Sequence, residues 1–442
     1  MKNVQGQNDA AGVGARAPGG GSAVAPLWVI LPVTWVNSLA TGVPFNGIFY
    51  IARDVYGFNT VLNSLLGIVM GVTYVAGALG AGPVIRWVLR RGMVGSPRGV
   101  MIWVILLLAL SCALPVTVIY GMRPDVAKGE GVWSLWVFLS VYSFLCGGLW
   151  PLVESFLAGG RSAAELRGAT GKFNITWSSA LVFSFWLLAL FNKEQRGYAI
   201  AVSAGMHLLS LIWVLRLPGV AGAHAHADHV PPPVYRKLLK GHRLLLPAAY
   251  LVMYTVLPML PGITKVIMTA GGWEEKLAER VEPLLVSLYL IARVAAFFTL
   301  ERWQGWHGKW ITASLGTTLL LVGCGAVILS PRMDLGGAAV GPLVIGLLAL
   351  GAGAATIYCG ALYYALEVGA AEVDAGGMHE AMIGVGYVMG PVCSLVPAVV
   401  VGGGDAAFWT VGMVGALAGG AVLGVVRIAR GEEQRQNSTA TN

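Results

Sequence analysis

Charged side chains are scarce in this chain. Asp, Glu, Lys and Arg make up 11% of its 442 residues, whereas an ordinary soluble domain has about 25%. Hydrophobic residues make up 56%, so the composition excludes an ordinary soluble domain. The net charge of +8 comes from bases in alternate loops, which indicates membrane topology and attraction to anionic lipids. No basic face with interleaved aromatic residues exists outside the apolar stretches, so we expect no nucleic-acid partner.

Cysteine is also rare, and none of it has the spacing of a metal site. The five cysteines all fall inside apolar stretches, so we interpret them as small packing residues rather than a disulfide framework. They are Cys112, Cys146, Cys324, Cys359 and Cys393. The chain contains no phosphate-binding loop, so it has no ATP-hydrolysing domain of its own. We expect neither a cofactor nor a metal.

Long apolar stretches are abundant. Each is about 20 residues long, enough to cross a bilayer as a helix, and backbone groups in lipid must pair within their own segment. The sequence therefore predicts an all-α polytopic membrane protein with about twelve transmembrane helices. The predicted spans are 27–52, 60–85, 99–120, 133–158, 169–191, 197–216, 244–270, 281–300, 310–330, 338–366, 378–402 and 406–427.

A polar connector divides these spans into two sets of six. It contains three consecutive prolines and the basic stretch 235–243, which could form a short helix on the membrane surface. Its histidines, His224, His226 and His229, invite a metal site, but histidines in a mobile loop more often bind nothing. The predicted units are a disordered tail 1–26, a six-helix bundle 27–216, the connector 217–243, a second bundle 244–427 and a tail 428–442.

The loops predict the orientation of the chain in the membrane. Alternate loops carry bases, whereas the other set, such as 123–130 and 273–282, is mixed or acidic. Because cytoplasmic loops are enriched in Lys and Arg, the basic set and both tails are predicted to be cytoplasmic. The bases are Arg86, Arg90, Arg91, Arg98, Arg161, Arg167, Arg236, Lys237, Lys240 and Arg243.

The two sets of spans repeat one another weakly. In the first set, a helix ends in GGLWPLVESFLAGG and the next opens with RGATGKFNITWSS. In the second set, the corresponding segments read IYCGALYYALEVG and GGMHEAMIGVGYVMGP. A parallel repeat of six-helix bundles produces such a correspondence and places a solute path between the bundles near the midplane.

This layout resembles the major facilitator superfamily over residues 27–427. The resemblance implies two pseudo-symmetric six-helix bundles around a central cavity that opens alternately to each side. The family's signature follows its second helix, where GPVIRWVLRR matches at Gly82, Arg90 and Arg91 but departs at Arg86 and Leu89. The corresponding loop after the eighth helix matches at Glu301 and Arg302. These five matching residues are the candidate gating residues.

Ionisable residues inside spans cost at least about 2.5 kcal/mol near the bilayer centre, so each needs a reason. Glu154 and Lys172 lie at similar distances from the loop that joins their antiparallel helices. They could form a structural ion pair. Alternatively, Glu154 could carry a proton or cation, with Lys172 modulating it.

Arg293, His379 and Glu380 are the other charged or titratable candidates. Arg293 lies in the middle of its span and cannot lose its proton, so it faces either an anionic solute or a protein partner. His379 and Glu380 open their span, where they could relay protons or simply cap the helix. His207, alone among apolar residues, is better explained as a satisfied buried histidine.

Polar and aromatic side chains within the spans complete the candidate solute path. In the resembled superfamily, the fourth, seventh and tenth helices help to form the cavity wall. The path candidates are Asn37, Thr41, Asn46, Trp150, Glu154, Asn174, Trp177, Tyr254, Tyr289, Arg293, Tyr358 and Tyr363.

These observations together predict a monomeric secondary transporter of a small organic solute, surrounded by membrane lipids and coupled to protons. A sensor or lipid scramblase with the same architecture is the first alternative. A membrane-embedded enzyme is the second, although the spans lack the clustered carboxylates or serine–histidine sets that such enzymes need.

Overall fold

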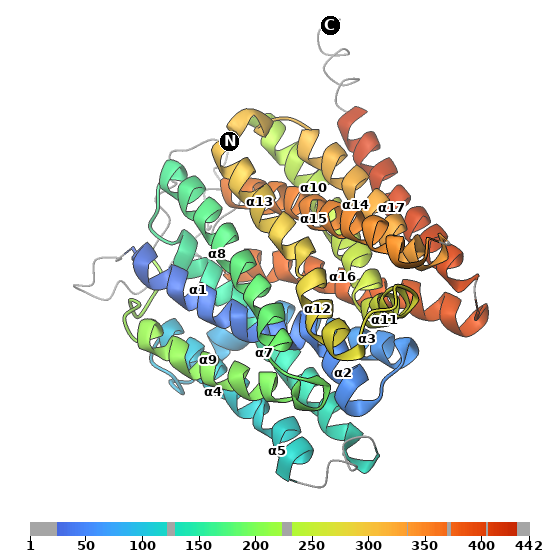
Figure 1. The fold of residues 1–442 in the computed structure, drawn as a ribbon. Coiled ribbons are helices and arrows are strands. Elements are labelled where there is room, and N and C mark those ends of the chain that lie inside the picture. The colour runs from blue at the N-terminus through green and yellow to red at the C-terminus, as the bar shows by residue number, and fades with distance from the viewer. Residues whose placement is uncertain are drawn as a thin grey trace, which may run out of the picture.

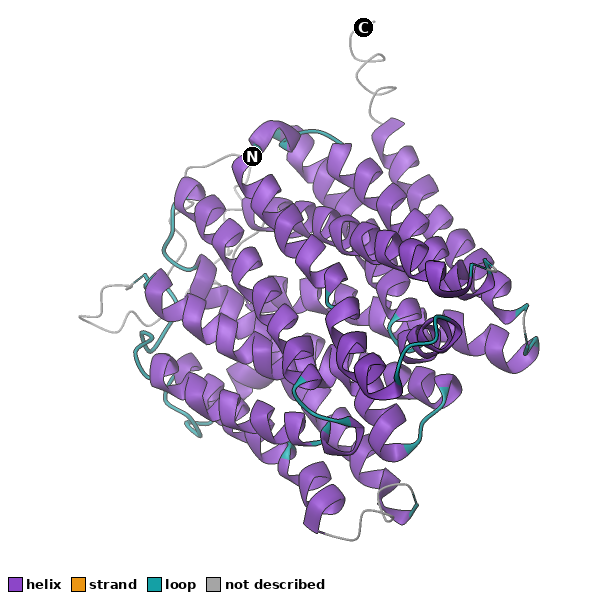
Figure 2. Ribbon diagram, viewed as in Figure 1, coloured by secondary structure: helices purple, strands orange, loops and turns teal. Residues whose placement is uncertain are grey.

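The computed structural model describes residues 24–121, 129–222, 232–333, 335–368, 373–403 and 405–430. Helices and short connecting loops account for all of them, and these described residues contain no strand (Figure 2). Most of the tail 1–26, the histidines of the connector and residues 431–442 lie outside the described residues.

The first half of the chain forms six helical segments. The first is interrupted by a π-helical turn, Val43–Gly47, in which Pro44 lacks an N–H for the regular helical ladder. The segments are α1 (Leu27–Gly42) with α2 (Ile48–Tyr56), α3 (Thr60–Arg90), α4 (Pro97–Ser111) with α5 (Ala113–Gly121), α7 (Trp133–Ala158), α8 (Ala163–Ala189) and α9 (Tyr198–Val214).

The second half forms six more. They are α10 (Pro233–Val256) with α11 (Leu260–Ala270), α12 (Glu275–Val286) with α13 (Leu288–Arg302), α14 (Ile311–Leu329), α15 (Val340–Val368), α16 (Val373–Val400) and α17 (Ala406–Arg430). Among the described residues, nine segments are long and apolar enough to cross a membrane, and α10 with α11 make a tenth that bends by 45°. The apolar helix α9 is shorter, with 17 residues, and α8 carries several charges.

The twelve segments match the twelve predicted spans, but the connector is shorter than predicted. Helix α10 begins at Pro233, so the stretch 235–243 is its first turns and not a separate surface helix. Leu238, Leu239 and His242 are buried there. His242 Nε2 lies 2.9 Å from the hydroxyl of Thr312 on α14. The helix continues because its bases occupy one side while this apolar side packs against the second bundle.

The two halves lie side by side, with the blue-to-green helices on one side and most of the yellow-to-red helices on the other (Figure 1). They meet mainly where α3 packs against α16 and where α8 packs against α13; α16 also contacts α7. Helices α3, α7 and α8 of the first half thus face α13 and α16 of the second.

Glycines allow the closest helix contacts. A Cβ placed on Gly351 of α15 would lie 1.7 Å from the carbonyl oxygen of Tyr289 on α13. A Cβ on Gly77 of α3 would lie 2.0 Å from the carbonyl oxygen of Phe144 on α7. Backbone atoms cannot give way as flexible side chains do, so these two contacts require glycine.

Replacing Gly351 with Ala is expected to destabilise the folded protein by at least about 2 kcal/mol, because α13 and α15 must separate. The control is Gly341→Ala on the same helix, where a Cβ meets nothing within 4 Å. The two variants are compared by their melting temperatures in detergent, measured as the fraction of protein that remains monodisperse after heating. Equal melting temperatures for both variants would contradict the packing described here.

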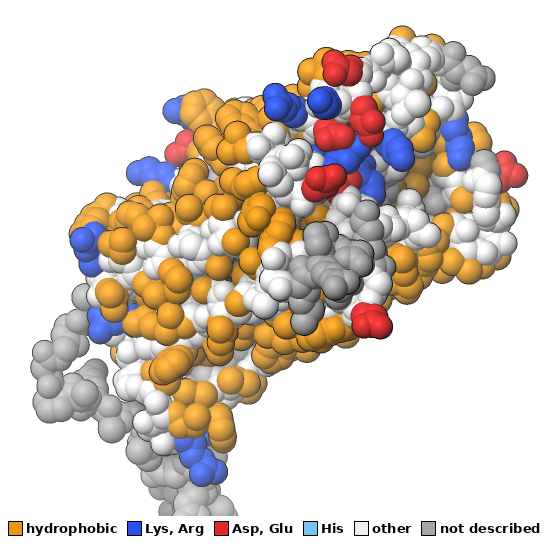
Figure 3. Space-filling model, turned by 60° about the horizontal axis from the view of Figure 1, so that its bottom comes forward, with side chains coloured by type: hydrophobic (Ala, Val, Ile, Leu, Met, Phe, Trp, Pro, Cys, Tyr) orange, Lys and Arg blue, Asp and Glu red, His pale blue; other side chains and the backbone are white. Residues whose placement is uncertain are grey.

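Large apolar side chains cover much of the outer surface, as a lipid-facing protein requires. In Figure 3 hydrophobic side chains are interspersed with backbone and other uncharged side chains over most of the visible face, and most of the visible acidic side chains gather with basic ones in one region. Exposed examples include Trp103, Leu110 and Leu190. The chain is an integral, multi-pass membrane protein.

Candidate functional site

A cavity of about 90 Å³ lies between the two halves, with room for several water molecules. Both halves contribute polar, charged and aromatic side chains to its wall. The lining residues are Ser38, Thr41, Phe45, Asn46, Tyr74, Trp150, Glu154, Phe173, Trp177, Leu181, Tyr250, Met253, Tyr254, Leu257, Arg293, Tyr358, Glu380, Ile383 and Tyr387.

Two buried carboxyl groups face each other across this cavity. Glu154 comes from α7 and Glu380 from α16, and they are 7% and 5% exposed. A ligand atom of each, together with a ring nitrogen of His379, lies within 4.8 Å of the others. The hydroxyl of Tyr74 on α3 donates a hydrogen bond to Glu380. Gly376 leaves room for Glu154, because a Cβ there would lie 2.8 Å from Glu154 Oε2.

The pair joins the two halves of the protein. Two carboxylates this close in a buried site repel each other, and a proton held between them removes the repulsion. His379 Nε2 has no hydrogen-bond partner among the described residues, so an imidazole nitrogen is available beside the two acids. This arrangement can hold a proton between the two acids.

Arg293 of α13 places a positive charge in the wall of the same cavity. Its guanidinium lies 5.5 Å from the ring centre of Trp177 and 5.6 Å from that of Tyr289. It is 5% exposed, makes no ion pair with any described residue, and its Nε lacks a hydrogen-bond partner. Aromatic faces stabilise the cation, but its hydrogen-bonding capacity remains open to an anionic group in the cavity.

Tyrosines form a large part of the remaining wall. The ring of Tyr387 lies 4.0 Å from that of Tyr254, 5.6 Å from Tyr250 and 5.2 Å from Tyr74, between ring centres. Phe45 packs against Tyr387 at 5.7 Å. These rings come from both halves and offer flat apolar faces with hydroxyls at their edges, a surface suited to an organic solute.

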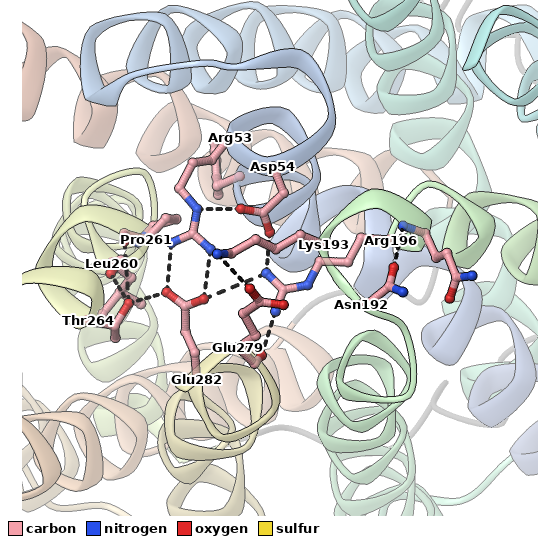
Figure 4. Close-up of polar contacts among 12 residues, drawn as sticks. Arg53, Asp54, Asn192, Lys193, Arg196, Leu260, Pro261, Thr264, Glu279 and Glu282 are labelled. Atoms are coloured by element: carbon pink, nitrogen blue, oxygen red, sulfur yellow. Dashed lines mark hydrogen bonds and ion pairs between the residues drawn. The ribbon is translucent and has the colours of Figure 1, made fainter. Parts of the chain in front are cut away.

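An ion-pair network links the two halves at the end of the helices that the sequence predicts to be outside (Figure 4). Arg53 of α2 makes a two-bond contact with Glu282 of α12, with both N–O distances 2.7 Å. Arg53 also donates to Asp54 at 2.7 Å. Arg196, after α8, pairs with Asp54 and lies 3.6 Å from Glu282. Because Arg53 and Arg196 belong to the first half and Glu282 to the second, the network fastens the halves together.

A more exposed contact flanks this network. Lys193 lies 2.8 Å from Glu275 and 2.7 Å from Glu279, both on α12. Partial burial lowers the pKa of Lys193, but the hydrogen bonds to Glu275 and Glu279 outweigh it and leave the pKa above its usual value. Exposed ion pairs of this kind contribute about 0–1 kcal/mol to stability. The buried Arg53–Glu282 pair is therefore the more important contact between the halves.

Three solved transporter structures have a similar arrangement of helices. The nucleoside transporter NupG superposes with a TM-score of 0.61 at 12% sequence identity, covering 91% of this chain and 98% of that one. The proton:xylose symporter XylE of the major facilitator superfamily gives 0.60 at 14%, covering 91% and 95%. The human organic anion transporter MFSD10 gives 0.56 at 15%, covering 91% and 98%.

This chain has the major facilitator fold. No protein-family model matches the sequence, and no curated protein matches it. The resemblance drawn from the residues is thus confirmed at the level of the fold.

Within the major facilitator fold, most of the predicted path residues meet at one cavity. Thr41, Asn46, Trp150, Glu154, Trp177, Tyr254, Arg293 and Tyr358 all line it. Tyr289 lies just behind, donating its hydroxyl to Asn46 Oδ1 at 2.8 Å. Their roles in binding stay predictions, but the structure brings them together from both halves.

Three predicted path residues lie elsewhere. Asn37 is bound within the first half, where its Oδ1 lies 2.9 Å from His207 Nδ1. His207 also contacts the Tyr142 hydroxyl at 2.7 Å, so it is the satisfied buried histidine that the sequence suggested. Asn174 and Tyr363 line a second cavity nearer the predicted cytoplasmic side.

The proposed ion pair between Glu154 and Lys172 is wrong. Lys172 is exposed, whereas Glu154 faces His379 and Glu380. Equal distance from a loop fixes depth but not the direction in which a side chain points around the helix. The capping role of His379 and Glu380 is wrong too, because α16 begins at Val373 and both residues lie beyond its first turn.

The candidate gating residues are only partly in loops. Helix α3 continues to Arg90, so Gly82 is a buried helical residue, while Arg90 and Arg91 are exposed at its end. Arg302 lies 4.0 Å from its neighbour Glu301. Glu301 packs on Gly171 of α8, where a Cβ would lie 2.4 Å from Glu301 Cγ.

Sequence reasoning missed both Tyr387 and the outer network. Tyr387 follows Glu380 by seven positions, two helical turns, so it shares its face and could have been found by that spacing. Arg53, Asp54, Arg196 and Glu282 gave no such signal, because each looks like an ordinary charge near the end of a span.

Proposed function

We propose that this protein is a secondary transporter that moves a small organic anion together with, or in exchange for, protons by alternating access. The observation that carries the proposal is the unpaired Arg293 in a cavity that also contains Glu154 and Glu380 from opposite halves. A buried cation without a partner is costly, and an anionic solute would supply the missing partner. Solved transporters share this fold, which favours transport through the cavity over catalysis within it.

Proton coupling follows from the position of the carboxyl pair. With the halves closed around the pair, a shared proton stabilises Glu154 beside Glu380. When the halves separate, water reaches both groups and their repulsion falls, so the proton can leave. Tyr74 holds Glu380 in place across the α3–α16 contact. Opening and closing would then load and unload one proton at each cycle.

The Arg53–Glu282 network, which joins the two halves, supports a state that is closed on the predicted outer side. With both tails in the cytoplasm, as the basic loops indicate, the next step of the cycle opens the inner side.

A neutral polar solute is the second candidate, favoured by the tyrosine surface and by the Asn46–Tyr289 pair, which can bond hydroxyl groups. XylE, a proton:xylose symporter, and NupG, a nucleoside transporter, have this fold.

Arg293→Gln is expected to lower uptake of an anionic solute into proteoliposomes about 10- to 150-fold, because one charged hydrogen-bonding group is worth about 1.5–3 kcal/mol. The solute class is first found by a thermal-shift screen, since binding to the folded state raises stability. Arg427→Gln, at the exposed end of α17, is the matched control. A neutral solute taken up equally by the wild type and Arg293→Gln would favour the second candidate, and lipid scrambling without solute uptake would contradict both.

A further inference from the structure

A second cavity, of about 300 Å³, lies between α8, α13 and α15 on the predicted cytoplasmic side. We call it the inner cavity. Its wall includes Arg167, Thr170 and Asn174 of α8, His307 after α13, and Tyr363 of α15. It is separate from the central cavity and is not used in the proton step described above.

Two buried polar groups in its wall have no partner among the residues that the structure describes. Thr170 Oγ1 and Asn174 Nδ2 make no hydrogen bond, although their residues are only 5% and 1% exposed. The other amide atom of Asn174 is occupied, because Oδ1 accepts from Trp177 Nε1 at 3.2 Å. Buried polar groups are nearly always paired, so a donor left free at a cavity wall points to a ligand with an acceptor.

The inner cavity also contains a positively charged side chain, Arg167, whose ion pair is partly exposed to solvent. Arg167 Nη1 lies 3.1 Å from Glu367 Oε1 on α15, and the Arg167 side chain is 39% exposed. Burial and the nearby charge of Arg167 lower the pKa of His307, so its ring is neutral at pH 7. That ring stacks on Tyr363 at 4.4 Å with 2° between the planes. The wall therefore combines a guanidinium, an amide donor and a flat stacked surface.

Three aromatic rings separate the two cavities. Trp177 and Tyr358 line the central cavity, and Phe297 lines the inner one. Their ring centres are 5.5 Å apart for Trp177–Phe297, 5.2 Å for Trp177–Tyr358 and 5.9 Å for Phe297–Tyr358. On α8, positions 167, 170, 174 and 177 recur every three or four residues and so share one face, which leads from Arg167 to the rings beneath Arg293.

We propose that the inner cavity is a second binding site for a carboxylate-bearing aromatic solute, which displaces Glu367 from Arg167 and bonds to Asn174. The three rings form the barrier that the solute crosses between this site and Arg293. That this solute is also the one transported rests on the proposed function. The inner binding site itself is argued independently of that function.

Binding of 4-fluorobenzoate to the purified full-length protein, followed by ¹⁹F NMR, tests this inference. Two bound signals are expected in the wild type. Arg167→Gln should remove one and Arg293→Gln the other, while Arg427→Gln keeps both. Glu367→Gln frees Arg167 and is expected to tighten the inner site at least about tenfold, the worth of a charged hydrogen bond. The nearly isosteric Asn174→Asp should weaken only the inner site, because it replaces a donor by a negative charge.

The outcomes separate the two proposals. A single signal that only Arg293→Gln removes would overturn the inner site and leave the proposed function standing. A single signal that only Arg167→Gln removes would support the inner site and count against Arg293 as the solute anchor. If the probe fails to bind even to Glu367→Gln, in which Arg167 has lost its carboxylate, the inner site is wrong.

Discussion

Replacing both Glu154 and Glu380 with Gln is expected to abolish proton-driven accumulation of solute while leaving solute exchange between the two sides. The amides keep the size and hydrogen bonding of the cavity wall but cannot release a proton. A pH difference of one unit is worth about 1.4 kcal/mol, or about tenfold accumulation for one proton per solute. The double variant should therefore take up solute only until the two concentrations are equal.

The measurement is uptake into proteoliposomes with and without a pH gradient, together with exchange at equal pH on both sides. Glu274→Gln, an exposed acid outside the cavity, is the control and should accumulate solute as the wild type does. Each single variant leaves one titratable carboxyl group without the repulsion of its partner. We therefore expect the pH dependence of solute uptake to change in both single variants. Accumulation by the double variant at the wild-type ratio would exclude the carboxyl pair as the coupling site.

Replacing Glu282 with Gln is expected to shift the protein from the outward-closed to the outward-open state. Removing one partner of a buried ion pair costs about 3–5 kcal/mol, and opening relieves that cost because water then reaches Arg53 and Arg196. About 5.5 kcal/mol converts a 1:99 equilibrium to 99:1. A loss of this size is therefore enough to make the open state a substantial population.

Spin labels at the exposed positions Leu62 on α3 and Leu277 on α12 report the separation of the two halves at this end. The label distance should lengthen in Glu282→Gln and stay short in the wild type. Lys193→Gln is the matched control, since the exposed pairs that it breaks contribute little. An unchanged distance in a folded Glu282→Gln protein would show that the network does not hold the outer side closed.

The helices could be predicted from local sequence, whereas the carboxyl pair and the Arg53–Glu282 network depend on residues that are far apart along the chain. Span 133–158 was predicted with its observed bounds, because an apolar stretch in lipid must be a helix whatever surrounds it. Glu154 was singled out for the same reason, as a charge that lipid does not tolerate. Its partner was misassigned because Lys172 lies near it in sequence, whereas Glu380 comes from the other half.

Hydrophobicity and charge act locally on each helix, so the amino-acid sequence was enough to predict a twelve-helix membrane protein and its two halves. Most of the predicted path residues also line the central cavity. Which charges meet depends on the packing of the helices against one another. Arg53 and Glu282 are 229 positions apart, and the rotation of each helix about its axis, which sets such contacts, depends on close packing between helices. The carboxyl pair, the outer network and the inner cavity all arise from that packing.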